Sequence, residues 1–519
     1  SHPTFNPVFT GVDDQVIIRV KIATEGIDNP IDVTSFTFNT NGTTATSDLV
    51  NAKLFYTGSA NQFSTDFQFG ATIVDFSAPF NITGTQELNP GNNYFWLAYS
   101  ISDAATLLNV VDAECTSLTC DAIARIPEVT APEGSRMIRG TLEGIYTVGD
   151  GGFYPNLNAA FSDVGILGLS GDLTFQIVSD IIEPAPAVLN QWNEIGGGGY
   201  YLTIRPEGGD RLIQGTFPSN GVIVLNGADR VIIDGELNEG ERNLYITNYT
   251  MTGPLCAIWL KSGSAALTGC NDVTIRNCVI SGSDRTITTS MGLVLGGPTL
   301  STGPTGYDHD NCLIENNKFK KVYYGGINAY GSSAGLYDNL QILNNEFGDD
   351  ELIESIGEIG LVIYYSPGAL VDGNHVHNLG QYSVVNYCIG FQIGTGCGNS
   401  FFTNNKIHTI WHTAYTYGGA HGINITTSTG NDNILIANNA IYDLVTTNYN
   451  ATNTAYNPFG IRIVGGTNIS ILHNSIHLYG TQQDGTGGYT NGTLSACIIA
   501  TSTAITGLDI RDNTLSNTL

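Results

Sequence analysis

One short pattern occurs eight times in the C-terminal half of this chain and limits what the chain can fold into. The pattern is an apolar residue, a variable residue, two positions that are mostly Asn, a variable residue and a second apolar residue. The eight copies span residues 275–280, 314–319, 342–347, 371–376, 402–407, 436–441, 471–476 and 510–515. Repeats with a period of roughly 20–50 residues are typical of stacked units that share one core. The repeated unit, a short strand with a polar corner, predicts the coil of a parallel β-helix.

A second repeat keeps step with the first. Each polar corner is preceded by a Gly-apolar-variable-apolar segment, at 292–295, 326–329, 360–363, 390–393, 422–425 and 460–463, while Ala257 and Cys497 fill the Gly place at the two ends. Alternation with period two puts the first apolar residue of each segment inside and the variable residue outside. The shared phase of the two repeats supports the β-helix prediction.

The second Asn of the corner forms a column of equivalent positions. Its members are Asn317, Asn345, Asn374, Asn405, Asn439, Asn474 and Asn513. Stacked strands lie about 4.8 Å apart, so the side-chain amides can hydrogen-bond along the stack. We expect these residues to form a structural ladder and to take no part in binding or catalysis.

The first 135 residues follow a different pattern. Alternating runs such as Val16–Ile22, Val33–Phe38 and Tyr94–Tyr99, separated by turn residues, predict an antiparallel β-sandwich. With Asn51–Gly58 and Gly91–Tyr99, this region resembles the N-terminal sandwich module of bacterial sialidase-type (BNR-associated) and other surface proteins. That resemblance implies an accessory domain and an extracellular location, and it implies no reaction. The catalytic blade repeat of sialidases, Ser-x-Asp-x-Gly-x-Thr-Trp, is absent from the sequence.

Residues 136–519 are expected to form the β-helix. After a linker at Val129–Gly134, the segments Gly140–Gly149 and Asn226–Gly235 resemble right-handed β-helix domains of large bacterial proteins exported by the type IX pathway. The resemblance implies a right-handed, secreted, cell-surface β-helix. The chain stops soon after a complete corner, and an open strand edge favours aggregation. We therefore expect further chain, or self-association, to cover Leu519.

Composition excludes several classes of partner. The net charge of −28 argues against nucleic acid and anionic lipid, and no apolar run approaches the roughly 20 residues of a membrane span. The nine cysteines show no zinc spacing, so neither a metal nor another cofactor is expected. Cys115 and Cys120 are the one local pair that could form a disulfide.

The segments between each corner and the following Gly lengthen toward the C-terminus. They grow from 7 positions between Phe319 and Gly326 to 21 between Ile476 and Cys497. Insertions in stacked repeats gather on one side, which is often the binding side. Aromatic residues of these segments are the candidate glycan-binding residues, namely Trp411, His412, Tyr415, Tyr417, Tyr382 and Tyr449. Rings stack on sugars, but the same rings can equally serve to pack the long loops.

The sequence contains no clear catalytic set, and no catalytic residue is predicted. Two groups of carboxylates were weighed as hydrolase candidates, Asp308 with Asp310 and the cluster of Asp349, Asp350, Glu351, Glu354 and Glu358. Turn capping and a solvated loop explain them more simply.

The outward positions after the ladder residues carry charge in four successive coils. They read Lys318, Glu346, His375 and Lys406, which could bring an acid, a base and a cation together. Cross-strand charge pairing explains this column more simply. The sequence favours an extracellular structural or adhesive β-helix protein, with a glycan or cell-surface ligand; the alternative is a secreted polysaccharide lyase or glycoside hydrolase.

Overall fold

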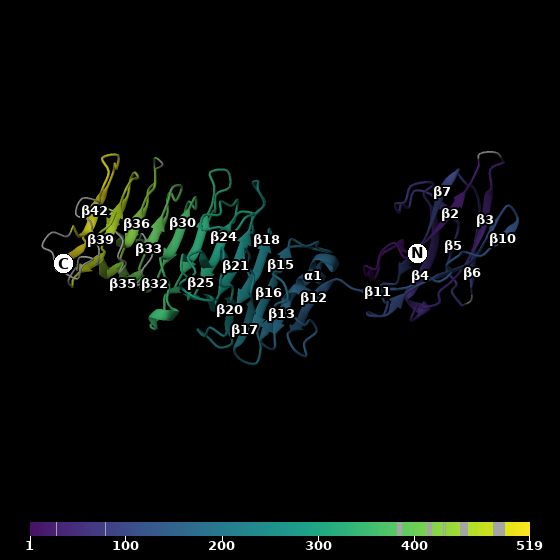
Figure 1. The fold of residues 1–519 in the computed structure, drawn as a ribbon, viewed down its shortest axis with the longest axis horizontal. Coiled ribbons are helices and arrows are strands. Elements are labelled where there is room, and N and C mark those ends of the chain that lie inside the picture. The colour runs from purple at the N-terminus through teal and green to yellow at the C-terminus, as the bar shows by residue number, and fades with distance from the viewer. Residues whose placement is uncertain are drawn as a thin grey trace. The chain divides into compact units, whose positions relative to one another are not determined.

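The computed structural model describes residues 1–26, 29–77, 79–380, 387–412, 418–428, 430, 432–446, 455–480 and 494–519. The chain separates into two compact units, Ser1–Thr141 and Leu142–Leu519. The fold is almost entirely β, as the sequence predicted, with antiparallel sheets in the first unit and long parallel sheets in the second (Figure 1).

The first unit is the predicted β-sandwich. Its two four-stranded sheets have the orders β2-β7-β4-β5 and β10-β9-β3-β6. The strands are β2 (Gln15–Thr24), β3 (Asp32–Asn39), β4 (Leu49–Tyr56), β5 (Gln68–Ile73), β6 (Phe80–Glu87), β7 (Gly91–Ile101), β9 (Glu114–Cys120) and β10 (Ile123–Arg125). A small third sheet joins β1 (Val8–Phe9), β11 (Arg136–Arg139) and β8 (Val110–Val111). Alternating inward residues supply the core, in which the rings of Phe36 and Phe95 lie 4.8 Å apart.

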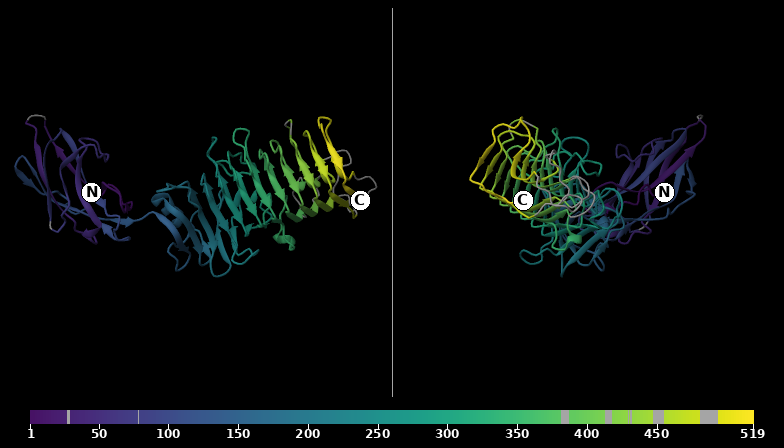
Figure 2. Two further views of the ribbon diagram at one scale, coloured as in Figure 1. Left: turned by 180° about the vertical axis from the view of Figure 1, so that it is seen from behind. Right: turned by 60° about the vertical axis from the view of Figure 1, so that its left-hand side comes forward.

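Three parallel sheets build the second unit, and each coil except those at the two ends contributes one strand to each sheet (Figures 1 and 2). Sheet 1 contains β12 (Leu142–Val148), β13 (Leu169–Ile177), β16 (Leu202–Pro206), β19 (Val231–Asp234), β22 (Thr274–Arg276), β25 (Leu313–Glu315), β28 (Gln341–Leu343), β31 (Leu370–Asp372), β34 (Phe401–Thr403), β37 (Leu435–Ala437), β40 (Ser470–Leu472) and β43 (Asp509–Arg511). Sheet 2 contains β14 (Ile181–Ile182), β17 (Arg211–Gly215), β20 (Leu244–Asn248), β23 (Cys278–Gly282), β26 (Lys318–Lys320), β29 (Glu346–Phe347), β32 (His375–Gly380), β35 (Lys406–His412), β38 (Ala440–Thr446), β41 (Ser475–Leu478) and β44 (Thr514–Asn517). Sheet 3 contains β15 (Ala187–Asn190), β18 (Ile223–Asn226), β21 (Leu255–Lys261), β24 (Ser290–Gly296), β27 (Gly325–Tyr330), β30 (Ile359–Tyr364), β33 (Tyr387–Ile393), β36 (Gly419–Ile425), β39 (Pro458–Ile463) and β42 (Ala496–Ala500). This is the parallel β-helix that the two repeats predicted.

A helix covers the N-terminal end of the stack. Helix α1 (Leu157–Leu167) buries one apolar face, including Leu157, Phe161 and Val164, against the first coils. The Asn156 side chain caps its first turn by accepting a hydrogen bond from the Ala159 N–H, and Gly168 ends it with a φ of 71°.

The Asn column joins sheets 1 and 2 at a tight corner. The Asn405 Nδ2 donates to Oδ1 of Asn439 at 3.0 Å and to the backbone carbonyl of Val371 in the coil before. The Asn405 Oδ1 in turn accepts from both nitrogens of Asn374. The same bonds recur from Asn317 to Asn513, at 2.9–3.1 Å between successive amides. Each coil is therefore hydrogen-bonded to the next by an amide that is buried from Asn317 to Asn474 and half-buried at Asn513.

The first Asn of the corner has a separate task. The residue before each ladder position has a left-handed backbone, as at Asn316 (φ 50°), Asn344 (φ 54°) and Asn404 (φ 55°). Asn accepts that conformation at lower cost than other residues with a side chain. The doubled Asn in the repeat thus combines a residue that makes the corner with a residue that bonds the stack.

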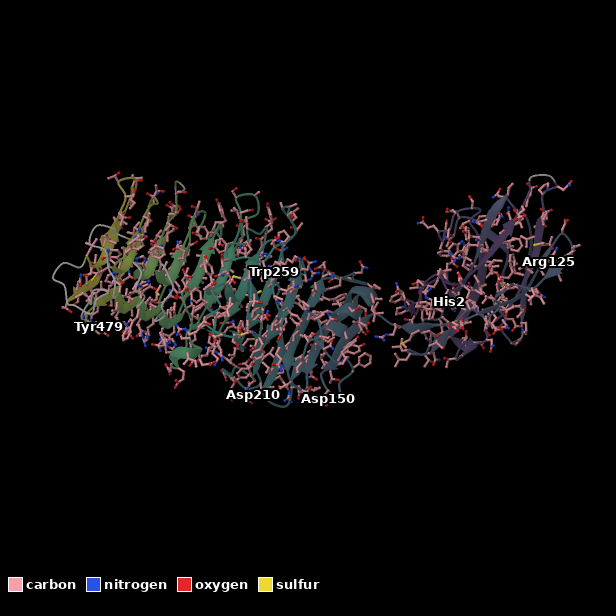
Figure 3. All side chains as sticks on the ribbon, in the orientation of Figure 1. His2, Arg125, Asp150, Asp210, Trp259 and Tyr479 are labelled. Atoms are coloured by element: carbon pink, nitrogen blue, oxygen red, sulfur yellow. The ribbon has the colours of Figure 1, made fainter. Side chains whose placement is uncertain are left out.

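The outward face of sheet 3 differs from the expectation of an exposed surface. Val294 and Val362, which point away from the coil interior, are fully buried beside covering segments. Trp259 of β21 belongs to one of these outer clusters (Figure 3). All nine cysteines are unbonded thiols, and Cys115 and Cys120 lie at two positions of the same strand, so the disulfide considered from the sequence is not formed.

Candidate functional site on the outer face of sheet 2

The aromatic candidates from the sequence fall into two groups. Tyr382, Tyr415, Tyr417 and Tyr449 lie outside the described residues. Trp411 and His412 were expected on a loop, but both belong to strand β35. His412 is fully buried, so its side chain is closed to a ligand. Strand β35 was not recognised there because its apolar alternation is interrupted after His408.

The charged column predicted from the sequence exists in the structure. Lys318, Glu346, His375 and Lys406 pair directly across strands β26, β29, β32 and β35. They occupy the outward positions of sheet 2, next to the inward residues Phe319, Phe347, Val376 and Ile407. The β-helix therefore presents these side chains in one line.

Within this column, Glu346 contacts three donor side chains. One carboxylate oxygen accepts from Arg242 at 2.7 Å, and the other lies 3.0 Å from the Lys318 ammonium and 3.4 Å from the Nε2 of His377. Burial alone would raise the pKa of Glu346, but these three donors hold it well below its usual range. Glu346 is consequently an ionised, fully engaged group, and it is unsuited to donate or accept a proton in a reaction.

Four of the other carboxylates that the sequence offered as hydrolase candidates are also engaged. Asp349 and Glu354 pair with Lys318, Lys320 and Lys321 at 2.8–3.6 Å. Asp308 accepts from the backbone N–H of Leu267, and Asp310 accepts from that of Asp338. Asp308 and Asp310 thus bond to the backbone of neighbouring coils. The second cluster is not the solvated loop that the simpler interpretation expected, because Asp349 and Glu354 are ion-paired and burial raises the pKa of Glu358 to about 7. The described residues contain no group of three or more His, Cys, Asp or Glu side chains able to hold a metal ion.

A second outward column of sheet 2 was missed in the sequence. His377, His408, Tyr442 and His477 pair across strands β32, β35, β38 and β41. The rings of His408 and Tyr442 stack in parallel at 4.7 Å, and those of His375 and His377 stack at 4.3 Å. Each residue lies three positions after a ladder Asn, a signal that could have been found by aligning the coils at that ladder.

His375 of the charged column and His408 of the second column are joined by a hydrogen bond between their rings. The Nε2 atoms of His375 and His408 lie 2.8 Å apart, so one ring donates a proton and the other accepts it. The Nδ1 of His408 lies 3.0 Å from the Thr409 hydroxyl, which lies 2.9 Å from a carboxylate oxygen of Asp443. Trp411 donates its Nε1–H to the other oxygen of Asp443 at 3.1 Å. Two side chains, His408 and Thr409, therefore connect His375 to the carboxylate of Asp443.

The direction of these hydrogen bonds follows from the carboxylate at the end. An ionised Asp443 only accepts, so the Thr409 hydroxyl donates to it and must accept from the Nδ1–H of His408. The Nε2 of His408 then has no proton and accepts from the Nε2–H of His375. This assignment leaves the Nδ1 of His375 with a free lone pair, and no described residue bonds to it.

The backbone is strained at the same place. Asn378, Thr409 and Asp443 each follow a member of the second column, and their φ angles are 56°, 54° and 55°. A left-handed backbone is uncommon for a β-branched residue such as Thr409 and is costly by about 1–3 kcal/mol. The kink aligns the Thr409 hydroxyl with both His408 and Asp443.

Both rings of the histidine pair are neutral at neutral pH. Burial, with the electrostatic effects of His377 and Lys406, lowers the pKa of His375 to about 4. Burial, with His375 and Lys406, likewise lowers the pKa of His408 to about 4. The ammonium of Lys406 is exposed and forms no ion pair with a described residue. A neutral base thus lies directly beside an unpaired cation.

An open hollow continues the same face toward the C-terminal end of the stack. It has a volume of about 580 Å³ and is lined by outward residues of β38, β41 and β44, with Tyr479 at its side. Tyr442 and His477 line its floor, and the rings of His477 and Tyr479 lie 4.6 Å apart. Tyr479 is labelled at this end of the stack in Figure 3. Since Tyr442 also stacks on His408, the hollow and the histidine pair form one continuous strip.

Comparison with solved structures finds chains of low identity. The Dettilon tailspike protein is 12% identical over 69% of this chain and 57% of its own, with a TM-score of 0.42. An alginate lyase from a Paenibacillus species is 14% identical over 70% of this chain and 94% of its own, with a TM-score of 0.36. The Hadza microbial sialidase Hz136 is 19% identical, and the match covers 26% of this chain and 30% of the sialidase, with a TM-score of 0.22. At these values, the likenesses add nothing to the fold that the strand pairing defines.

No curated protein matches the sequence. Among the described residues, no helix has the length and apolarity needed to cross a membrane. The first unit, however, does match a family: residues 2–122 fit the model of the N-terminal domain of BNR-repeat neuraminidase.

Proposed function

We propose that this protein is an extracellular bacterial β-helix protein that binds a polysaccharide along the outer face of sheet 2. The observation that carries the proposal is the continuous strip from the histidine pair to the hollow beside Tyr442 and Tyr479. The description of the matched family names a neuraminidase, which is consistent with a glycan ligand and with secretion.

The hollow has the chemistry that sugars require. Aromatic rings offer an apolar face to the C–H bonds of a sugar ring, while Tyr hydroxyls, Ser475, Thr514 and Ser516 offer hydrogen bonds. Tyr479 is 38% exposed, although burial of so large an apolar ring would be favourable. A stacking contact contributes about 1–2 kcal/mol per ring, so several contacts along the strip are needed for useful affinity.

The strip extends parallel to the stacking direction. Successive outward side chains are about 4.8 Å apart, close to the length of one sugar residue, so a chain of sugars can contact successive coils. Binding of this kind suits an adhesive protein that holds a polymer, and it suits equally an enzyme that acts on one.

The test is binding to a panel of neutral and acidic polysaccharides by isothermal titration calorimetry. We expect at least one polymer to bind the wild type, and the Tyr442→Ala/Tyr479→Ala variant to bind it about 10-fold or more weakly. Phe401→Ala is the matched control, because Phe401 is an aromatic residue of the coil before that of Tyr442 and is 45% exposed on sheet 1. Equal loss in both variants, or no binding by the wild type, would contradict the proposal.

A further inference from the structure

We propose that His375 is a catalytic base and that the protein cleaves uronic-acid polysaccharides by β-elimination at this strip. The inference rests on the proposed glycan binding to sheet 2 and adds a reaction and a substrate class to it. Its parts are the free lone pair on His375, the unpaired Lys406 beside it, and the chain of hydrogen bonds that ends at Asp443.

The base is identified by elimination among the ring nitrogens of the histidine pair. The Nε2 atoms of His375 and His408 bond to each other, and the Nδ1 of His408 bonds to Thr409. The Nδ1 of His375 is the remaining nitrogen, and in the assigned tautomer it carries a lone pair. It can therefore take a proton from a bound molecule without breaking a hydrogen bond within the protein.

The cation selects a carboxylate next to the reacting carbon. Lys406 pairs with His375 on the neighbouring strand, so its ammonium and the base are available to adjacent atoms of one sugar. Removing the C5 proton of a uronate requires that the negative charge of its carboxylate be balanced. The other cations of this face, Lys318 and Arg242, are already bound to Glu346. Lys406 is thus the cation left for a substrate.

Substrate binding would also strengthen the base. The positive charge of Lys406 is one cause of the lowered pKa of His375, after burial and His377. A uronate carboxylate paired with Lys406 offsets that charge, so the pKa of His375 rises when the substrate is in place. A base that is neutral in the free protein thus becomes stronger only in the complex.

The reaction consumes no water and needs no oxidant. The C5–H bond breaks and its proton goes to the Nδ1 of His375, while the electron pair is held by the C6 carboxylate against Lys406. The C4–O bond then breaks, a C4=C5 double bond forms, and the leaving oxygen takes a proton from water. The hydroxide so formed recovers the proton from His375, which leaves a shortened chain and an unsaturated uronate end.

Thr409 and Asp443 are positioning residues in this scheme. They fix the tautomer of His408, which in turn keeps the Nε2 proton on His375 and the lone pair on its Nδ1. When His375 takes a second proton, its Nε2–H donates more strongly to His408, and the carboxylate of Asp443 stabilises the positive charge through the chain.

The net charge of −28 does not oppose an anionic substrate at this place. Exposed charges farther away than about 8 Å are largely screened at physiological ionic strength. Within the strip, Glu346 and Asp349 are neutralised by Arg242, Lys318 and Lys320. Lys406 is therefore the unpaired cation of the strip, and the exposed Asp350 and the hydrogen-bonded Asp443 are its remaining acidic groups.

The experiment measures binding and cleavage separately on polygalacturonate, alginate, hyaluronan, chondroitin sulfate and glucuronan. Cleavage is read by the ultraviolet absorbance of the unsaturated end. We expect one of these polymers to bind and to be cleaved. His375→Gln keeps a donor at the Nε2 position, and we expect it to lower kcat by about 10²–10⁴-fold while its Kd stays within about 2-fold.

Lys406→Met should behave differently from His375→Gln. It removes the charge and keeps the length of the side chain, so we expect both weaker binding and a lower kcat. Lys261→Met is the matched control, since Lys261 is a lysine of sheet 3 that lies over the ring of Trp259. Its binding and its rate should equal those of the wild type.

Thr409→Val tests the positioning role with a readout that stability does not move. The variant keeps the shape of Thr409 and removes the hydroxyl, so nitrogen NMR should show His408 leaving the Nδ1–H tautomer. The rate should fall by about 10-fold or more with Kd unchanged. An unchanged tautomer and rate would remove Thr409 and Asp443 from the mechanism.

The outcomes separate the two proposals. Binding of a uronate polymer without any unsaturated product overturns the elimination and leaves the binding proposal intact. New reducing ends without unsaturation overturn it as well, in favour of hydrolysis. Binding of neutral polymers alone overturns the substrate class, and binding of no polymer overturns both proposals.

Discussion

Two positions that are adjacent in the chain show how this β-helix separates structure from chemistry. The ladder position is Asn in seven coils, and its side chain points into the corner, where it bonds the coil before and the coil after. The next position points out of sheet 2 and changes from coil to coil, from Lys318 to Glu346, His375 and Lys406. Both positions recur at the same corner in each of these coils. The ladder Asn repeats because every coil needs its hydrogen bonds to the neighbouring coils. The outward residue is not needed for stacking, so it can vary and is free to bind a ligand.

The largest expected effect comes from breaking the repeated position. Asn405→Leu removes one amide that donates to Asn439 and Val371 and accepts from Asn374. Each buried group left unpaired costs about 1–3 kcal/mol, so we expect a loss of about 3–5 kcal/mol in the free energy of unfolding. Chemical denaturation monitored by circular dichroism measures it.

The matched control is Asn404→Gly in the same corner. Asn404 is exposed and has a φ of 55°, a conformation that Gly adopts without strain. We expect a change of less than about 1 kcal/mol. Equal effects of the two variants would show that the ladder amides contribute no more than the corner conformation.

Glu358 occupies a third kind of position, at which a carboxyl occurs in one coil and uncharged residues occur in the neighbouring coils. Glu358 corresponds to Tyr324 in the coil before and to Cys388 in the coil after, so no coil requires its charge. Burial raises the pKa of Glu358 to about 7. The unfolded chain ionises at a lower pH than the folded chain, so this group reduces stability progressively as pH rises from about 4.5 to 7.

Glu358→Gln should therefore stabilise the protein at pH 8 and change little at pH 5. The expected gain at the higher pH is on the order of 2–3 kcal/mol. Thermal unfolding of both proteins across this pH range measures the difference. A gain of the same size at pH 5 would mean that the charge of Glu358 is not the cause.

The smallest effect concerns the histidine pair. Because the pKa values of His375 and His408 are lowered to about 4, the folded chain binds fewer protons than the unfolded chain between about 6.5 and 4. The contribution of the two rings to stability is complete above about pH 6.5 and is lost as the pH falls through about 4. His377 and Lys406 lower both pKa values, while Glu346 and Asp350 oppose that effect on His375.

The variant His375→Gln/His408→Gln should flatten this acid limb of the stability profile. The two rings are partly exposed, so each contributes less than about 1 kcal/mol after screening by solvent. Denaturation at pH 4.5 and pH 7 should differ less in the variant than in the wild type. A wild-type profile that rises as pH falls over this range would contradict the assigned neutral state of the pair.

The sequence predicted the fold because the fold is repetitive. The Ile-x-Asn-Asn pattern and the Gly-apolar segments share one phase. That phase predicted the burial of inward residues such as Ile314 and Leu361. Neither repeat predicts helix α1, since it occurs once and its apolar face is set by the end of the stack. Repetition is what made the strand register readable.

The site could not be predicted in the same way. The column of His377, His408 and Tyr442 follows from the shared phase of the coils, but the hydrogen bonds from His408 through Thr409 to Asp443 depend on the kink at Thr409, and a left-handed Thr has no sequence signal. Trp411 was assigned to a loop because the alternation of β35 breaks at that kink. The charged column of Lys318 and His375 was found from the sequence, but its partition into an engaged half and a free half depends on side-chain contacts.

The most direct test of the account is the footprint of a bound oligosaccharide, measured by amide hydrogen exchange. The probe is an oligosaccharide of the polymer that binds most tightly in the panel. The account predicts slowed exchange in β32, β35, β38 and β41 of sheet 2, with sheet 1 and the sandwich unchanged. Protection confined to the sandwich, or to strands of sheet 1, would contradict the central claim that the varying face of the β-helix is the functional one.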